Sequence, residues 1–197
     1  MRDHDAAFQW WSKAGAEGHV LALHNLALDY IGGVGGPQDY AKAVDYLSQA
    51  SARGFANSQY TLGKMYHYGL GVEQDFTKRA RFFELAASQG FVKAAYNLGK
   101  LYRDGNGVEV DHARSAQWFK LAAQAGYAKA QRHLARRLAA GKGVAKDEEA
   151  ALKWALLAAG AGVENTRTLA DELKASLGAD AISRVEQAMK QFRPRER

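Results

Sequence analysis

Lysines and arginines that recur at a fixed interval are the side chains of this sequence best suited to joint chemistry. The interval is 36 residues, and within the copies further cations follow one helical turn later. Cationic groups held at such spacing can converge on carboxylates, which accept charge-assisted hydrogen bonds. The pattern therefore predicts recognition of an acidic segment by seven cations: Lys64, Lys93, Lys100, Arg103, Lys129, Arg132 and Arg136.

Other kinds of reactive or ligand-binding site find little support in the sequence. Gly69-Leu-Gly71 is reminiscent of a phosphate loop, but no Gly-Lys-Ser/Thr follows it. Residues 104–111 look like part of a calcium loop, yet the sister loop at 141–147 lacks equivalent ligands. No two of the six histidines stand at helical zinc-pair spacing, and no nucleophile motif occurs. We therefore predict a non-enzymatic protein with no cofactor and no metal site.

The composition excludes several further classes of protein. The chain is 47% hydrophobic and 24% charged, and it has no apolar run near the length of a membrane span, so no membrane insertion is expected. Its polar start does not resemble a signal peptide, which favours the cytoplasm; a periplasmic or secreted location stays open if the chain is a fragment of a longer precursor. The absence of cysteine excludes disulfides and thiolate metal sites. A net charge of +6 favours acidic partners but is too small to demand nucleic acid.

The elements that must position these cations are four copies of one unit. Leu26, Leu62, Leu98 and Leu134 stand 36 residues apart, and each is followed by a small residue, a large apolar residue and a Gly-x-Gly pair. This order predicts a first helix that ends at glycine. A second helix is predicted to begin after an aspartate N-cap and to bury one large aromatic per copy. The aspartates are Asp39, Asp75, Asp111 and Asp147, and the aromatics are Tyr46, Phe82, Trp118 and Trp154. Such units bury their apolar faces against their neighbours in a solenoid.

These residues resemble the Sel-one-like repeat, a 36-residue helix–turn–helix relative of the tetratricopeptide repeat. The resemblance implies an all-α, right-handed α/α superhelical solenoid and a role as adaptor in protein complexes, often in bacterial signalling, envelope or host-interaction systems. We expect a half repeat plus four repeats over residues 1–163. Residues 164–197 are expected to form capping helices and a short, mobile basic tail. Leu138 departs from the pattern, because the other copies have Tyr at its position.

The resemblance also implies which face binds a partner. In tetratricopeptide relatives the first helix of each unit lines a concave surface, and seven of the twenty positions expected there are Lys or Arg, whereas none is acidic. An ordinary solvated face is the alternative interpretation. The predicted groove consists of the seven cations together with polar and aromatic side chains that would add hydrogen bonds and stacking, namely Asn57, Tyr60, Tyr96, Asn97 and His133.

The two ends of the repeat array suggest alternative modes of binding. The chain opens on the second helix of a unit without its first helix, which leaves Trp10 and Trp11 short of a partner. They could form an edge through which a regulatory subunit engages another protein or its own copy in a homodimer. A single-stranded nucleic-acid-binding solenoid, with Tyr60 and Tyr96 stacking on bases, is a further alternative. We predict a scaffold that binds an acidic peptide or protein segment in the basic groove.

Overall fold

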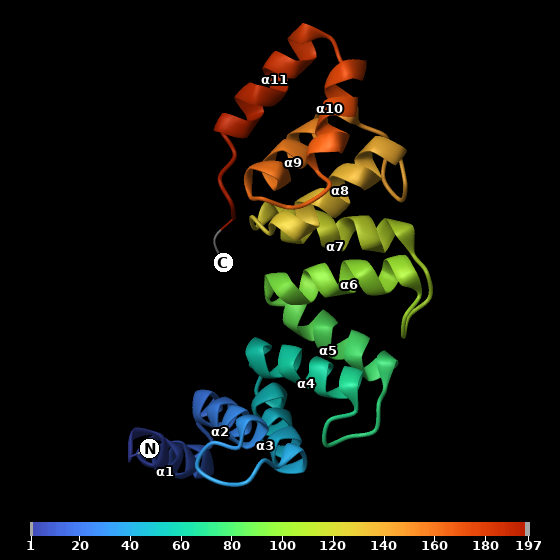
Figure 1. Cartoon of the computed structure of the whole chain (residues 1–197). Coiled ribbons are helices and arrows are strands. Elements are labelled where there is room, and N and C mark those ends of the chain that lie inside the picture. Colours follow the sequence, from blue (N-terminus) through green and yellow to red (C-terminus); the bar gives the residue numbers. More distant parts are fainter. Residues whose placement is uncertain (1, 196–197) are drawn as a thin grey trace. The chain divides into compact units, whose positions relative to one another are not determined.

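The computed structural model describes residues 2–195 of the chain, with side chains from residue 6 onward. The described residues form helices joined by short loops and contain no strand (Figure 1). The helices are α1 (Arg2–Ala16), α2 (Val20–Gly32), α3 (Tyr40–Ala52), α4 (Ala56–Tyr68), α5 (Phe76–Ser88), α6 (Val92–Asp104), α7 (His112–Gln124), α8 (Ala128–Ala140), α9 (Glu148–Gly160), α10 (Arg167–Ser176) and α11 (Ala179–Lys190).

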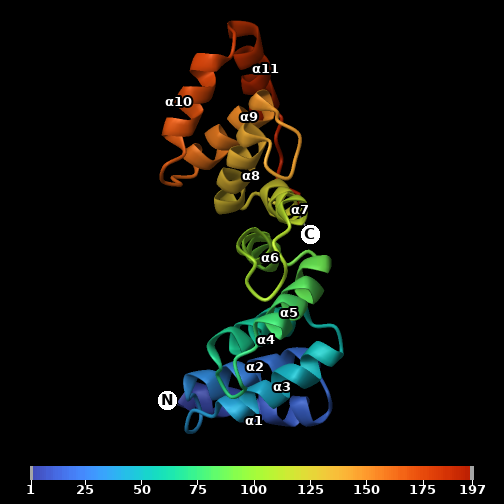
Figure 2. The same cartoon turned by 90° about the vertical axis from the view of Figure 1, so that its right-hand side faces the viewer.

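The chain divides into two compact units, Met1–Ala94 and Ala95–Arg197. In the first unit the helices pack in chain order, α1 on α2, α2 on α3, α3 on α4 and α4 on α5. In the second unit α7 packs on α8 and α8 on α9, and α9 is in turn covered by α10 and α11 (Figure 2). Sequential neighbours are therefore spatial neighbours, as expected for repeated helical units.

Local side-chain chemistry places the helix ends where the sequence predicts them. The Asp39, Asp75, Asp111 and Asp147 carboxylates each accept a hydrogen bond from the backbone N–H three residues later, at 2.8–3.0 Å. This bond satisfies one of the free N–H groups at the start of α3, α5, α7 and α9. At the ends of α2, α4 and α8, glycine adopts the left-handed conformation that turns the chain out of a helix.

The apolar core confirms the repeat pattern. Leu26, Leu62, Leu98 and Leu134 are at most 2% exposed. The small residue after the leucine lets the helices of a unit approach closely, because a Cβ on Gly99 would lie 2.7 Å from the Phe119 ring. The first-helix Tyr also packs on the second-helix aromatic. The rings of Tyr30 and Tyr46, for example, stack at 5.7 Å.

The segment after α11 does not project from the molecule as the predicted mobile tail. The Phe192 ring packs edge-on against Trp154 at 5.3 Å, and the Arg195 backbone N–H donates to the Gln124 carbonyl at 2.9 Å. Figure 1 shows this segment returning from α11 toward α7. Residues 196 and 197 of the predicted tail lie outside the described part of the chain.

Candidate functional site

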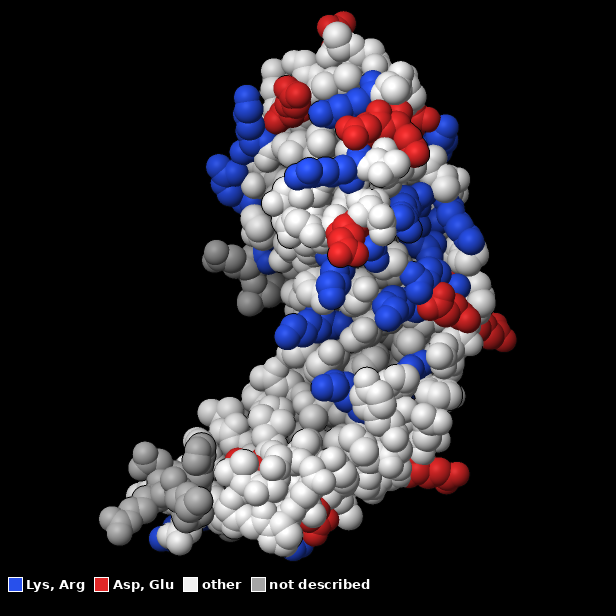
Figure 3. Space-filling model, viewed as in Figure 1, with Lys and Arg blue, Asp and Glu red and all other residues white. Residues whose placement is uncertain are grey.

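Lysine and arginine side chains gather on one face of the second unit, over α6 to α8 (Figure 3). α6 supplies two of the predicted groove cations to this unit, and α8 supplies three. We name this set the α6–α8 basic surface; it consists of Lys100, Arg103, Lys129, Arg132 and Arg136. Lys129 and Arg136 are exposed, whereas the other three side chains are half-buried.

A polar cavity of about 640 Å³ opens beside α8. We name it the α8 cavity. It lies between α8, Tyr96 on α6 and the loop that follows α9, and its walls are Tyr96, Tyr127, Ala128, Lys129, Arg132 and residues 161–164. Two predicted groove cations and one predicted groove aromatic thus share one concave site.

Arg132 is the central polar group of the α8 cavity. Its Nη1 donates a long hydrogen bond of 3.5 Å to the Glu164 carbonyl oxygen. Its Nε is buried and has no hydrogen-bond partner among the described residues. A guanidinium has five N–H donors, and the one inter-residue bond described for this guanidinium is long, so Arg132 can also donate to an acceptor that a ligand brings into the cavity.

Two carboxylates lie near the predicted groove cations, although neither belongs to the twenty positions expected to line the groove. Asp104, at the end of α6, holds Arg103 in a bidentate pair, with Nε and Nη2 at 2.6 and 2.7 Å from its two oxygens. This pairing raises the pKa of Arg103 and lowers the pKa of Asp104. Glu164 is the other carboxylate, at the rim of the α8 cavity. Arg103 is therefore largely committed to its neighbour, and Lys129 and Arg132 are the better-placed cations.

His133 serves as a packing residue of α8. Its ring stacks on Phe119 at 4.6 Å, and its Nδ1 lies 3.5 Å from Arg103 Nη1. Burial lowers the pKa of His133 to about 4, and the surrounding arginines, Arg103, Arg132, Arg136 and Arg137, act in the same direction. The imidazole is therefore neutral at neutral pH and adds no charge to the basic surface.

This pKa makes His133 a source of acid sensitivity. Between pH about 6.5 and about 4 the unfolded chain binds a proton at His133 that the folded chain does not, so the free energy of unfolding falls as the pH decreases through this window. We expect the free energy of unfolding, measured in urea, to be lower at pH ~4.5 than at pH ~7. His133→Gln should reduce this difference by about 1–2 kcal/mol. An equal acid loss in the variant and the parent protein would contradict the assignment.

The remaining predicted groove residues have mixed roles. Four of them belong to the first unit, namely Asn57, Tyr60, Lys64 and Lys93. The candidate site therefore consists of residues of the second unit alone. Tyr60 is used in packing, with its ring 5.2 Å from Phe83 and 4.8 Å from Phe91. In the second unit, Asn97 and Lys100 are half-buried on α6, and the Lys100 ammonium lies 5.9 Å from the Tyr96 ring.

Sequence reasoning missed two contributors to this region. Tyr127 lines the α8 cavity and its ring lies 5.0 Å from Tyr96. An aromatic recurs at its position in the earlier copies, as Phe55 and Phe91, which was a usable signal. Arg137 is buried, and its Nη1 donates to the carbonyl oxygens of His112 and Lys142. The sequence feature that could have identified Arg137 is a cation at a position that is apolar in the two preceding copies, where Met65 and Leu101 stand.

The predicted N-terminal edge is only partly exposed. Trp10 on α1 is 70% exposed, with the Lys13 ammonium 5.8 Å from its ring, whereas Trp11 is half-buried. Among the described residues, no helix has the length and apolar character of a membrane span. The same part of the chain contains no cluster of three or more side chains suited to hold a metal ion.

Successive two-helix units, capped by aspartate and turned by glycine, define an all-α repeat protein of the solenoid class. The model of the Sel1 repeat matches residues 1–19, 20–55, 56–91, 92–127 and 128–163. The chain therefore belongs to the Sel1 repeat family, and the family and all-α fold predicted from the sequence are confirmed. Sel1 repeat proteins generally act as scaffolds for protein interactions.

Solved structures with the same fold come from bacteria. A protective antigen of uropathogenic Escherichia coli strains with an SLR fold is 28% identical, with a TM-score of 0.83 over 93% of this chain and 40% of that protein. A Sel1 repeat protein from Oxalobacter formigenes is 29% identical, with a TM-score of 0.73 over 79% of this chain and 64% of that one. The chain thus spans less than two thirds of either protein. A comparison with curated proteins gives no match.

Likeness of fold extends to a more distant protein. An immunity protein from Pseudomonas aeruginosa is 24% identical, with a TM-score of 0.50 over 94% of this chain and 72% of that protein.

Proposed function

We propose that this protein is a non-enzymatic scaffold that binds an acidic segment of a partner protein in the α8 cavity and along the α6–α8 basic surface. The observation that carries the proposal is that two cationic residues, Lys129 and Arg132, line one cavity. A carboxylate placed in this cavity would accept from the Arg132 guanidinium and would lie close to two positive charges. Hydrogen bonds between charged groups are among the stronger polar contacts in proteins.

The surroundings of Arg132 support recognition of a protein segment. Tyr96 and Tyr127 add aromatic walls on which the apolar parts of a peptide can pack. Lys100, Lys129 and Arg136 form none of the ion pairs found among the described residues, so their charges can attract an approaching acidic chain. The cavity thus provides contacts at close range, and the exposed cations provide attraction at longer range.

A short acidic peptide tests the proposal before the partner is identified. We expect calorimetry to detect binding of hexaglutamate to the parent protein and no binding of hexalysine. Raising the salt concentration from about 50 to about 300 mM should weaken binding several-fold, because the Debye length shrinks from ~14 to ~6 Å. Hexathymidylate is the comparison for nucleic acid. If it bound more tightly than hexaglutamate at equal salt, the single-stranded nucleic-acid function would be favoured instead.

Glu164 offers a matched test of the electrostatic mechanism. Its carboxylate at the rim of the α8 cavity repels an acidic ligand, so Glu164→Gln should tighten hexaglutamate binding about two- to fivefold. The control is Glu186→Gln on α11, which removes the same charge from an exposed position outside the cavity lining. Equal effects of the two substitutions would show that net charge, rather than the cavity, controls binding.

The exposed Trp10 favours a second candidate mode of binding. A large apolar side chain that is 70% exposed suits a contact with another protein or a second copy of this chain. Sedimentation of the parent protein and of Trp10→Ala tests self-association through this edge. A concentration-dependent dimer that Trp10→Ala abolishes would support a homodimer, whereas a monomer in both cases would remove that mode.

A further inference from the structure

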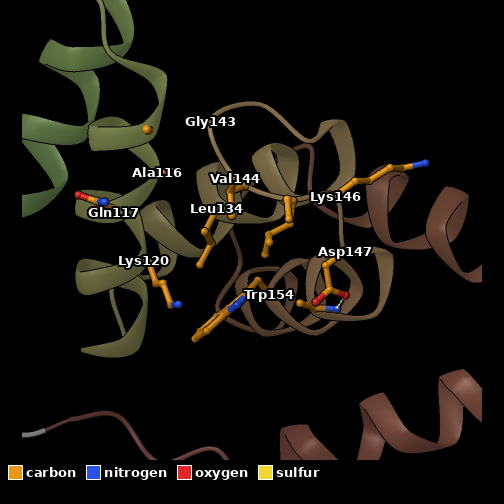
Figure 4. Close-up of a pocket in the computed structure, with 13 residues that line it drawn as sticks. Ala116, Gln117, Lys120, Leu134, Gly143, Val144, Lys146, Asp147 and Trp154 are labelled. Atoms are coloured by element: carbon orange, nitrogen blue, oxygen red, sulfur yellow. Dashed lines mark hydrogen bonds between the residues drawn. The ribbon is translucent and has the colours of Figure 1, made fainter.

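A second cavity in the same unit is not used by the proposed function. It has a volume of about 620 Å³, in the range of small-ligand pockets, and lies between α7, α8, the loop before α9 and the first turns of α9. We name it the α7–α9 cavity. Figure 4 shows Leu134 and Trp154 facing its interior, with Lys120 at the edge formed by α7. None of its lining residues lines the α8 cavity.

Two substitutions in the last repeat account for this space. In each of the first three repeats the first helix carries a Tyr and the second helix carries a cation close to that ring. The cation-to-ring distances are 5.2 Å for Lys42 and Tyr30, 5.2 Å for Lys78 and Tyr66, and 5.5 Å for Arg114 and Tyr102. The fourth repeat has Leu138 in place of the Tyr and Ala150 in place of the cation.

Both replacement residues line the α7–α9 cavity. The fourth repeat therefore lacks a ring and a cationic side chain at the place where the cavity lies. In the first two repeats the corresponding Tyr ring stacks on the second-helix aromatic, at 5.7 Å on Tyr46 and at 5.5 Å on Phe82. Trp154 is the second-helix aromatic of the fourth repeat, and it lines the cavity without a first-helix ring to stack on it.

The chemistry of the walls matches the missing ring. Leu134, Leu138 and Val144 form apolar walls, and Trp154 offers a π-face on which a ring can stack. Lys120 and Gln117 are exposed polar side chains on α7, and Lys120 is in none of the ion pairs among the described residues. A cation at the cavity edge repeats the cation-and-ring pairing of the first three repeats. Lys146, by contrast, points away from the cavity and pairs with Glu148 at 2.7 Å.

We propose that the α7–α9 cavity is a docking site for a tyrosine side chain presented by a partner protein. The incoming ring takes the place of the Tyr that the first three repeats supply from their own chain. It stacks on Trp154, and its hydroxyl lies within reach of Lys120 or Gln117. Tyr102 provides the internal precedent, because its hydroxyl oxygen accepts a hydrogen bond from Arg114 Nη1 at 3.2 Å. This site does not depend on the α8 cavity.

The test uses the neutral peptide Gly-Gly-Tyr-Gly-Gly, with Gly-Gly-Ala-Gly-Gly as its control. In a titration followed by two-dimensional NMR of the full chain, the Tyr peptide should shift the Trp154 indole N–H and the Val144 and Leu138 signals. The Ala peptide should leave these signals unchanged. If the Tyr peptide shifts none of them at millimolar concentration, the proposal is wrong. It is equally wrong if p-cresol binds and the Tyr peptide does not, because the cavity then takes a small molecule only.

A substitution that fills the cavity from inside provides the decisive control. Leu138→Tyr restores the ring of the other repeats and should weaken binding of the Tyr peptide at least about tenfold, whereas Leu85→Tyr adds the same ring at an exposed position on α5, outside the cavity lining, and should leave binding unchanged. If Leu138→Tyr fails to fold, Ala113→Trp covers the cavity from an exposed position on α7 and should have the same effect. Undiminished binding in the folded, filled variant would overturn the proposal.

Discussion

Reversing the charges of Lys100, Lys129 and Arg136 together is expected to abolish binding of an acidic partner. Each side chain contributes attraction from the α6–α8 basic surface, and the triple change to Glu replaces three attractive charges with three repulsive ones. We expect a loss of affinity of at least about 100-fold, mostly through slower association. Calorimetry with hexaglutamate measures this loss, and circular dichroism should show unchanged helicity, because none of the three side chains belongs to the buried core.

A second triple reversal controls for net charge. Lys142, Lys174 and Lys190 lie outside the lining of the α8 cavity, and changing all three to Glu alters the net charge by the same amount. Binding to this control should fall less than about tenfold, since only long-range attraction is reduced. If both triple variants lose affinity equally, the α6–α8 basic surface has no specific role. Arg132 is left out of both sets because its partly buried side chain contributes to local packing.

Gly143→Ala is expected to be among the most destabilising single substitutions in the second unit. Gly143 has φ of +74°, and a Cβ there would overlap the carbonyl group of His112. The loop before α9 would then have to move away from α7. We expect a loss of about 3–4 kcal/mol, of which ~1–2 kcal/mol is backbone strain and the rest is the steric overlap. Urea unfolding followed by circular dichroism measures it.

Gly162 separates the two causes of this loss. Its φ of +76° is nearly the same, but a Cβ added there meets no atom within 4 Å. Gly162→Ala should therefore cost only the strain, about 1–2 kcal/mol. Similar losses for the two variants would show that the close approach of Gly143 to His112 contributes nothing to stability.

The features predictable from the sequence are those set by neighbouring residues in the chain. Asp111 caps α7 through a bond to Arg114, three residues away, and a left-handed glycine such as Gly69 ends a helix through its own φ. The close approach of Gly143 to His112 was not predictable in the same way. The positive φ was expected, but the approach involves residues 31 positions apart and depends on how the repeats stack.

The candidate site was predictable in its charge and not in its shape. The five cations of the α6–α8 basic surface were predicted from their spacing, whereas the α8 cavity requires the loop at 161–164 to lie near Tyr96. The pairing of Arg103 with Asp104 was missed because only the positions expected to face the groove were counted. The replacement of Tyr by Leu138 was visible in the sequence. The replacement of a cation by Ala150 could be linked to it only from the structure, because the structure shows that both residues line one cavity.

The Arg132 Nε–H resonance is the most direct measurement of acidic-segment binding in the α8 cavity. In a titration of the ¹⁵N-labelled protein with hexaglutamate, we predict a shift of this resonance, because a carboxylate bound to the same guanidinium changes the electronic environment of its N–H groups. The Tyr96 and Tyr127 ring signals should change at the same peptide concentration. An Arg132 signal that stays in place while the peptide binds, with the largest changes at the Trp10 indole, would contradict the proposed site and place the interaction at the N-terminal edge.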